Sequence, residues 1–111
     1  MDERDFDLKA GQVIERLMTA VEDQVPDAEV DLEGGILTIT LPEVGSYLIN
    51  KHRPNKEIWL SSPKSGAWHF AHDPEAGWIS TRVVDDARPC LHRLLADELA
   101  DATGEPVEFH E

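Results

Sequence analysis

An amphipathic helical pattern stands at each end of this 111-residue chain, and the residues between the two read as short strands. Over residues 5–24 the apolar side chains recur at steps of three and four, which indicates a helix with one buried face. Pro26 ends this helix. A second helix is expected to open near Pro89 and to be capped by Gly104. The buried stripes comprise Phe6, Ala10, Val13, Ile14, Leu17 and Val21 in the first helix, and Leu91, Leu94, Leu95, Leu99 and Ala102 in the second.

Short segments between the helices predict strands separated by turns. They are residues 28–33, 36–41, 46–52, 56–61, 67–71 and 78–82. Gly34-Gly35 is a hairpin signal between the first two. A sheet with both helices on one face buries every apolar stripe. The sequence therefore predicts a single α+β domain over residues 1–111. It is a two-layer sandwich in which two terminal helices cover one face of a five- to six-stranded antiparallel sheet, and the other face meets water.

Charge is spread unevenly along the chain. Ten Lys and Arg oppose 23 Asp and Glu, for a formal net charge of −13. Residues 1–33 and 73–111 are strongly acidic, whereas residues 44–72 carry a net positive charge. Binding to a nucleic-acid backbone or to an anionic membrane requires clustered cations, so this composition argues against both kinds of partner. No apolar run approaches the roughly 20 residues of a membrane span.

The side chains that usually carry catalysis or tight metal binding form no recognisable motif. Cys90 is the one cysteine, which excludes an internal disulfide and favours a reduced cytosol; it is expected to be a buried or half-buried small residue. No glycine-rich phosphate loop or nucleophile elbow is present. We expect no catalytic residues. A structural or solvent-exposed role is expected for the five histidines, His52, His69, His72, His92 and His110.

Strand alternation predicts which side chains face water on the uncovered side of the sheet. In residues 56–61, burial of Ile58 and Leu60 sends Trp59 outward. Glu57 then shares this face, as do Leu48, Asn50 and His52 of the preceding strand. An outward Trp is typical of an anchor for a protein partner, because Trp is enriched at interface hot spots. The alternative is that Trp59 packs under a loop.

Several motifs follow one another in a fixed order over residues 47–66, namely Asn50-Lys51, Pro54-Asn55-Lys56 and Ile58-Trp59-Leu60-Ser61-Ser62-Pro63. The same pattern continues outside this segment in the acidic first helix, Gly34-Gly35-Ile36-Leu37-Thr38, Trp78 and Leu91-His92-Arg93-Leu94-Leu95. Together these motifs resemble the frataxin family over nearly the whole chain. The resemblance implies a small α+β sandwich that takes part in iron–sulfur cluster assembly. Such a protein binds iron weakly and contacts a cysteine desulfurase and its scaffold protein.

The resemblance also implies roles for individual residues. Trp59 would be the sheet-surface tryptophan that meets the assembly machinery, and Asn50 would reach toward the metal-ligand region of the scaffold. The implied partner-binding set is Leu48, Asn50, Glu57, Trp59 and His69. The implied iron ligands form an acidic ridge on the first helix and first strand, namely Asp7, Glu15, Glu22, Asp23, Glu29, Asp31 and Glu33. His69 stands where eukaryotic relatives tend to carry arginine. Other departures thin the ridge, since Gly11, Gln12 and Thr19 stand where those relatives often carry acids.

The spacing of these carboxylates predicts weak and exchangeable metal binding. Glu15 and Glu22 differ by about 20° around a helix and by about 10 Å along it. The three strand acids repeat about every 6.6 Å on one strand face. Each carboxylate would act alone, and water would complete the coordination of Fe²⁺ or Fe³⁺. Two alternatives are a solvated helix face and an electrostatic docking strip for a basic partner.

We therefore expect a non-enzymatic, iron-binding modulator of iron–sulfur cluster assembly that docks on the cysteine desulfurase and scaffold complex through its open sheet face. One alternative is an acidic protein-interaction module with incidental metal binding, and another is an iron-storage or ferroxidase oligomer. We expect a monomer, with oligomers forming in excess iron. The acidic start of the chain favours a bacterial cytoplasmic protein, and a processed mitochondrial matrix form is the alternative.

Overall fold

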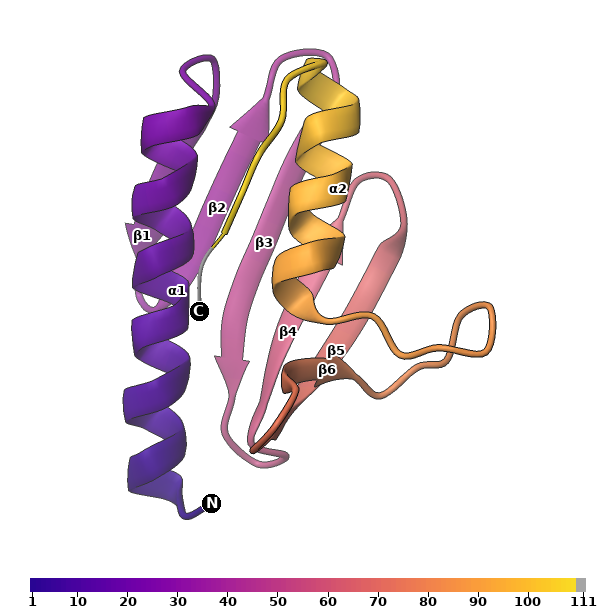
Figure 1. Ribbon diagram of the computed structural model, residues 1–111. Coiled ribbons are helices and arrows are strands. Elements are labelled where there is room, and N and C mark those ends of the chain that lie inside the picture. Colours follow the sequence, from indigo (N-terminus) through magenta and orange to yellow (C-terminus); the bar gives the residue numbers. More distant parts are fainter. Residues whose placement is uncertain (110–111) are drawn as a thin grey trace.

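The computed structural model describes residues 1–109. Two helices, α1 (Glu3–Gln24) and α2 (Leu91–Thr103), lie on the same face of one sheet (Figure 1). The six strands are β1 (Glu29–Glu33), β2 (Ile36–Leu41), β3 (Gly45–His52), β4 (Glu57–Ser62), β5 (Gly66–Asp73) and β6 (Gly77–Ser80). They lie in sequence order and every neighbouring pair is antiparallel. The predicted α+β sandwich is confirmed.

Helix α1 begins two residues earlier than its apolar pattern predicts. Asp2 is its N-cap, and the Asp2 carboxylate accepts a hydrogen bond from the backbone N–H of Asp5 at 2.8 Å. Glu3 and Asp5 place negative charge in the first turn, where the helix dipole favours it. All six residues of the predicted stripe are buried.

Left-handed backbone at two turns sets the register of the hairpins. Gly34 and Gly35 have φ angles of 59° and 79°, which a two-residue hairpin turn requires, and Glu33 therefore pairs with Ile36. Lys56, with φ of 52°, ends the turn between β3 and β4. Because successive strand residues face opposite sides, these turns decide which side chains reach the core and which reach the open face.

The core lies between the two helices and the sheet. Tyr47, Ile49 and Ile58 project toward the helices and are fully buried. Phe6 of α1 meets Trp78 of β6 edge-on, with ring centroids 6.0 Å apart. Each large apolar side chain that is fully buried contributes about 1.5–3 kcal/mol, so this layer supplies most of the driving force for folding.

A hydrogen-bonded cluster also joins α2 to the sheet. The Glu98 carboxylate accepts hydrogen bonds from the hydroxyls of Tyr47 at 3.0 Å, Ser62 at 2.6 Å and Ser65 at 2.6 Å. The Ser65 hydroxyl oxygen accepts from the indole N–H of Trp68 at 2.8 Å. Burial, together with the negative charge of Glu98, raises the pKa of the Tyr47 hydroxyl well above its usual range.

The predicted end of the last strand and start of the second helix are both wrong by two residues. β6 ends at Ser80 instead of residue 82, because the Ser80 hydroxyl donates to the carbonyl of Arg82 and accepts from its N–H, both at 2.9 Å. This local ring bends the chain away from the sheet. α2 begins at Leu91 with Cys90 as its N-cap, so Pro89 precedes the helix.

The buried stripe of α2 also differs from its prediction. Leu91, Leu95 and Leu99 are fully buried, but Leu94 and Ala102 are only partly covered. His92 is buried in their place, with 7% of its surface exposed. Leu91 and His92 are neighbours in the first turn, so the stripe widens there toward α1. No helix among residues 1–109 is both long and apolar enough to span a membrane.

Candidate functional site

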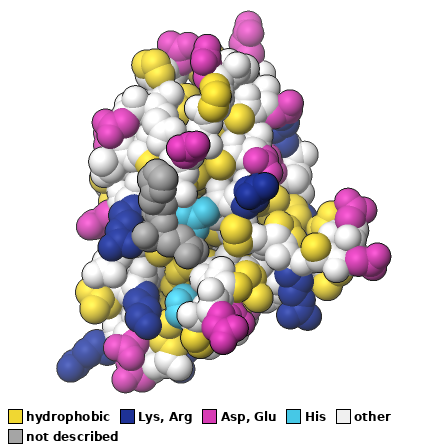
Figure 2. All heavy atoms as spheres, in the orientation of Figure 1, with side chains coloured by type: hydrophobic (Ala, Val, Ile, Leu, Met, Phe, Trp, Pro, Cys, Tyr) yellow, Lys and Arg dark blue, Asp and Glu magenta, His cyan; other side chains and the backbone are white. Residues whose placement is uncertain are grey.

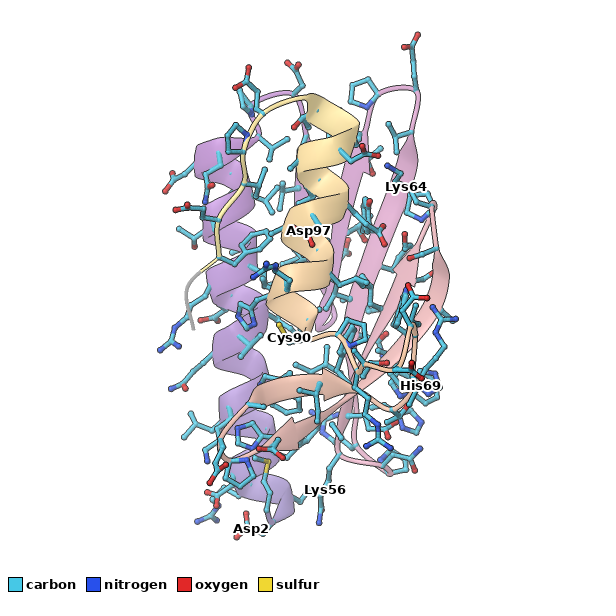
Figure 3. The ribbon with its side chains drawn as sticks, turned by 45° about the vertical axis from the view of Figure 1, so that its right-hand side comes forward. Asp2, Lys56, Lys64, His69, Cys90 and Asp97 are labelled. Carbon is cyan, nitrogen blue, oxygen red and sulfur yellow. The ribbon has the colours of Figure 1, made fainter. Side chains whose placement is uncertain are left out.

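The face of the sheet opposite the two helices carries the predicted docking residues. Direct cross-strand pairing places Asn50 of β3, Trp59 of β4 and His69 of β5 in one row across this face. Leu48 lies in the next row, opposite Ser61. Figure 3 labels His69, which projects from the sheet on the side away from α2. The structure thus brings the predicted partner-binding residues together on three adjacent strands, β3, β4 and β5.

Trp59 is held between two imidazole rings. Its ring centroid lies 3.7 Å from that of His52 and 4.1 Å from that of His69, with interplanar angles of 10° and 8°. The side chain remains partly exposed. Trp59 therefore stacks within the open face, and the alternative in which it packs under a loop is wrong.

Glu57 orients this His52–Trp59–His69 stack. Its carboxylate accepts a hydrogen bond from the indole N–H of Trp59 at 2.9 Å and lies 3.9 Å from Nδ1 of His69. Only 14% of the Glu57 side chain is exposed, so the charge is partly desolvated beneath the stack. Sequence reasoning placed His52 on this face and expected a structural or solvent-exposed role for it, but did not predict its contact with Trp59. The register makes His52 a diagonal cross-strand neighbour of Trp59, which brings the two rings within reach.

Asn50 lies at the edge of a shallow cavity beside the stack. Its amide donates to the carbonyl of Lys51 at 3.1 Å. The cavity has a volume of about 410 Å³ and is also lined by Ile36, Lys51 and Arg53. Leu48 and Ile36 leave 41% and 43% of their surfaces exposed, so apolar surface adjoins the polar residues of this face. Such a mixture is typical of a protein–protein interface.

The strand acids lie on the same face, at the edge of the sheet. Asp31 pairs with Thr38, which pairs in turn with Leu48, and Glu33 pairs with Ile36. Glu29 and Asp31 line a shallow hollow of about 420 Å³ on β1 and β2. These carboxylates therefore border the open sheet face that carries the predicted docking residues.

The helix acids are dispersed around α1. Glu15 and Asp23 line a groove of about 620 Å³ between α1 and Glu108 of the C-terminal segment. Asp23 lies about 100° around the helix from Glu22. Asp7 pairs with Arg53 at 2.9 Å and with Lys51 at 3.7 Å, so its charge is already partly compensated.

No three His, Cys, Asp or Glu side chains among residues 1–109 are grouped closely enough to hold one metal ion between them. The seven ridge acids can therefore bind iron only singly or in pairs, and water would fill the remaining coordination positions.

The other residues that the sequence analysis named lie away from this open face. His72 contacts Trp78 edge-on at 5.1 Å on the helix side of the sheet, so it does not join His69. Cys90 is partly buried at the start of α2 (Figure 3). His110 lies outside the described residues.

The chain is similar to known proteins along most of its length. The family model for a frataxin-like domain matches residues 1–105. The mitochondrial frataxin of Arabidopsis thaliana is 36% identical over 115 residues, covering 98% of this chain and 59% of that protein. The chain thus spans little more than half of this relative. The iron–sulfur cluster assembly protein CyaY of Neisseria meningitidis is 35% identical over 101 residues, covering 87% of this chain and 89% of that protein.

Solved structures agree with the fold. A frataxin from Psychromonas ingrahamii superposes with a TM-score of 0.82 over 100% of both chains, at 22% identity, which is a likeness of fold alone. A trimeric frataxin from Saccharomyces cerevisiae, complexed with ferrous iron, has a TM-score of 0.66 at 33% identity and covers 95% of this chain and 88% of that one. The family match and the curated relatives lead to one conclusion: this chain belongs to the frataxin family.

Proposed function

We propose that this protein is a non-enzymatic modulator of iron–sulfur cluster assembly. Relatives that match 87% or more of the chain include a bacterial protein named for iron–sulfur cluster assembly and a mitochondrial frataxin. The bacterial relative supports a role for this chain in iron–sulfur cluster assembly. For its location we propose the bacterial cytoplasm, with the mitochondrial matrix as the alternative.

The open sheet face is the proposed docking surface for the cysteine desulfurase and its scaffold. The observation that carries this proposal is Trp59, partly exposed at the centre of an uncovered sheet face between two stacked imidazoles. A rigid aromatic side chain that is already ordered loses little entropy on binding, which makes it an efficient anchor. Asn50 and Leu48 supply adjacent polar and apolar contacts.

Iron would bind weakly to single carboxylates of the acidic ridge. The ridge acids are mostly exposed and form no group of three within the described residues, which supports exchangeable binding of Fe²⁺ or Fe³⁺ through oxygen and water. The yeast frataxin complexed with ferrous iron supports iron as the metal. In this proposal, iron is either a cargo that the protein carries or an effector that binds to it.

An anaerobic NMR titration of the full chain with Fe²⁺, repeated with the desulfurase and scaffold, tests both parts. We expect line broadening near Glu15, Glu22 and residues 29–33, and a separate footprint of the partners around Asn50 and Trp59. The variant Asp7→Asn/Glu15→Gln/Glu22→Gln/Asp23→Asn should lose the broadening on the helix. A control of equal charge, Asp85→Asn/Asp86→Asn/Asp97→Asn/Glu105→Gln, should retain it. Absence of iron-specific broadening at submillimolar metal would remove the iron role.

A second candidate is an acidic interaction module in which iron binding is incidental. The position of Glu29, Asp31 and Glu33 along the border of the docking face favours it, because charges there would steer a basic partner. Under this reading, substitution of the helix acids changes only the salt dependence of association.

A further inference from the structure

The six-stranded sheet has two edges, and the chain closes only one of them. At the β6 edge, Ile79 forms an isolated bridge with Cys90, and the backbone N–H of Ser80 donates to the carbonyl of Pro89 at 2.8 Å. At the other edge, β1 pairs with β2, and no other described strand lies beside it. Figure 1 shows β1 at the outer side of the sheet, behind α1. The outer side of β1 therefore has no strand partner within residues 1–109.

The Gly34–Gly35 turn determines which backbone groups face this open edge. A two-residue hairpin turn closes on a hydrogen-bonded pair, here Glu33 and Ile36. Hydrogen-bonded and non-hydrogen-bonded pairs alternate along an antiparallel ladder, so the N–H and C=O groups of Val30 and Leu32 point away from β2. The pairing is one to one along the whole of β1, and β1 contains no proline. Neither a bulge nor a missing N–H blocks the edge, which leaves it open to a further strand.

The side chains of β1 alternate between acidic and apolar. Glu29, Asp31 and Glu33 are exposed on the open sheet face, whereas Val30 and Leu32 point to the helix side, where Leu32 is 36% exposed. Figure 2 shows that acidic and basic side chains are mixed on the face that carries the helices. On β1, by contrast, the three acids follow one another with no base between them. A strand that adds here meets negative charge on one face and apolar side chains on the other.

This pattern disfavours a second copy of the chain as the added strand. If the β1 strands of two copies paired with their open faces on the same side, acids would lie opposite acids, and like charges directly opposite destabilise a strand pair. The net charge of −13 adds to the repulsion. A segment with Lys or Arg opposite the acids and apolar residues opposite Val30 and Leu32 is favoured instead, because both kinds of cross-strand pair are stabilising.

We infer that the outer edge of β1 is a docking edge for an extended segment of a protein partner in which basic and apolar residues alternate. The segment would join the sheet as a further strand. Backbone hydrogen bonds to Val30 and Leu32 supply the affinity, and the alternation of side chains supplies the specificity. The inference goes beyond the proposed function, because it depends on backbone groups at the sheet edge and not on Trp59.

Two peptides of equal composition test this edge, namely the alternating peptide Lys-Val-Lys-Val-Lys-Val-Lys and the block peptide Lys-Lys-Lys-Lys-Val-Val-Val. In NMR titrations of the full chain, the alternating peptide should shift the amides of residues 29–33 saturably, with a Kd of about 1 mM. At about 10 mM peptide, solvent exchange of the Val30 and Leu32 amides should slow about tenfold, because the free edge becomes that much rarer. Equal binding of the block peptide would reduce the effect to net charge, and unchanged exchange of both amides would show that no strand is added. Either result overturns the proposal.

Variants of β1 separate backbone pairing from charge. Leu32→Pro removes one outward N–H and leaves the ladder to β2 intact, so it should weaken binding of the alternating peptide about tenfold. Leu32→Val keeps that N–H and should change the Kd less than threefold. Glu29→Lys/Asp31→Lys/Glu33→Lys should bind Glu-Val-Glu-Val-Glu-Val-Glu in place of the lysine peptide, and this test holds even if Leu32→Pro does not fold. Full affinity in folded Leu32→Pro, or an unchanged peptide preference after charge reversal, would refute the docking edge.

Discussion

Trp59 faces the open side because β4 alternates, and its orientation comes from the rings on each side of it. His52 and His69 reach it from the two neighbouring strands, and Glu57 accepts its N–H. Pairs of stacked rings contribute about 0.5–1.5 kcal/mol each beyond the area that they bury. The stack therefore stabilises the fold and holds the proposed anchor ready for docking.

Substitution of Trp59 should separate these two contributions. Trp59→Ala should lower the free energy of unfolding by about 1–3 kcal/mol through loss of both ring contacts. It should also weaken association with the desulfurase–scaffold complex at least tenfold. Trp59→Phe keeps an aromatic ring between the imidazoles and should retain most of the stability. Urea unfolding and partner titration measure the two effects, and unchanged affinity in Trp59→Ala would move the docking site elsewhere.

Tyr47 makes stability depend on alkaline pH. Its pKa in the folded state is raised by burial and by the Glu98 charge, so the folded chain keeps a proton that the unfolded chain loses above pH of about 10. This contribution is complete below that pH. As the pH rises further, the free energy of unfolding should fall by up to about 1.4 kcal/mol per pH unit.

The Tyr47→Phe variant isolates this effect from lysine titration. It should lack the additional slope between pH of about 10 and 11, at the cost of about 1 kcal/mol at neutral pH from the lost hydrogen bond. Tyr47 is the one tyrosine of the chain, so the tyrosinate absorbance band follows its proton directly. Appearance of that band in the folded protein near pH 10 would contradict the prediction.

At the scale of elements, Glu98 connects α2 to β3, to β4 and to the turn between β4 and β5. Glu98→Ala removes the acceptor of three hydroxyls and should lower the free energy of unfolding by about 2–4 kcal/mol. Asp97→Ala is the matched control, because Asp97 is 72% exposed and pairs only with Arg93 among the described residues. It should change stability by less than about 0.5 kcal/mol. Equal losses in the two variants, measured by urea unfolding, would deny Glu98 this linking role.

The boundaries of helices and strands can be predicted from the sequence where a local rule sets them. They cannot be predicted where a side chain has several roles open to it. The Gly34–Gly35 turn and the stripe of α1 follow from backbone freedom and helical period. The end of β6 depends on a Ser80 hydroxyl that bonds two backbone groups of Arg82, and serine alternates between such roles according to its neighbours. The burial of His92 likewise depends on tertiary neighbours, because His92 lies between a cavity lined by α1 and another lined by residues 107–109.

At the scale of the whole molecule, three acids gather along one edge of the open sheet face. Glu29, Asp31 and Glu33 lie on β1, and they border the proposed docking surface there. Acids next to an interface change the rate of encounter with a basic partner more than the lifetime of the complex.

The variant Glu29→Gln/Asp31→Asn/Glu33→Gln should therefore slow association with the desulfurase–scaffold complex and flatten its dependence on ionic strength. Dissociation should change little. Stopped-flow measurements between ionic strengths of about 0.03 and 0.5 M test this, with Asp85→Asn/Asp86→Asn/Glu105→Gln as the equal-charge control. If the control slows association as strongly, steering comes from net charge and the border acids have no special part.

Local patterns in the sequence predict the two helices, the run of antiparallel strands, the uncovered face and the outward direction of Trp59. These features depend on periods of 3.6 and 2 residues and on turn residues, all of which act over short stretches of chain. Packing between elements sets the rest: His52 and His69 enclose Trp59, and Asp7 pairs with Lys51 and Arg53. It also brings Lys9 and Arg16 to one small cavity with His72 and His92. Each of these contacts crosses from one strand, helix or turn to another, so strand register and helix placement set their distances.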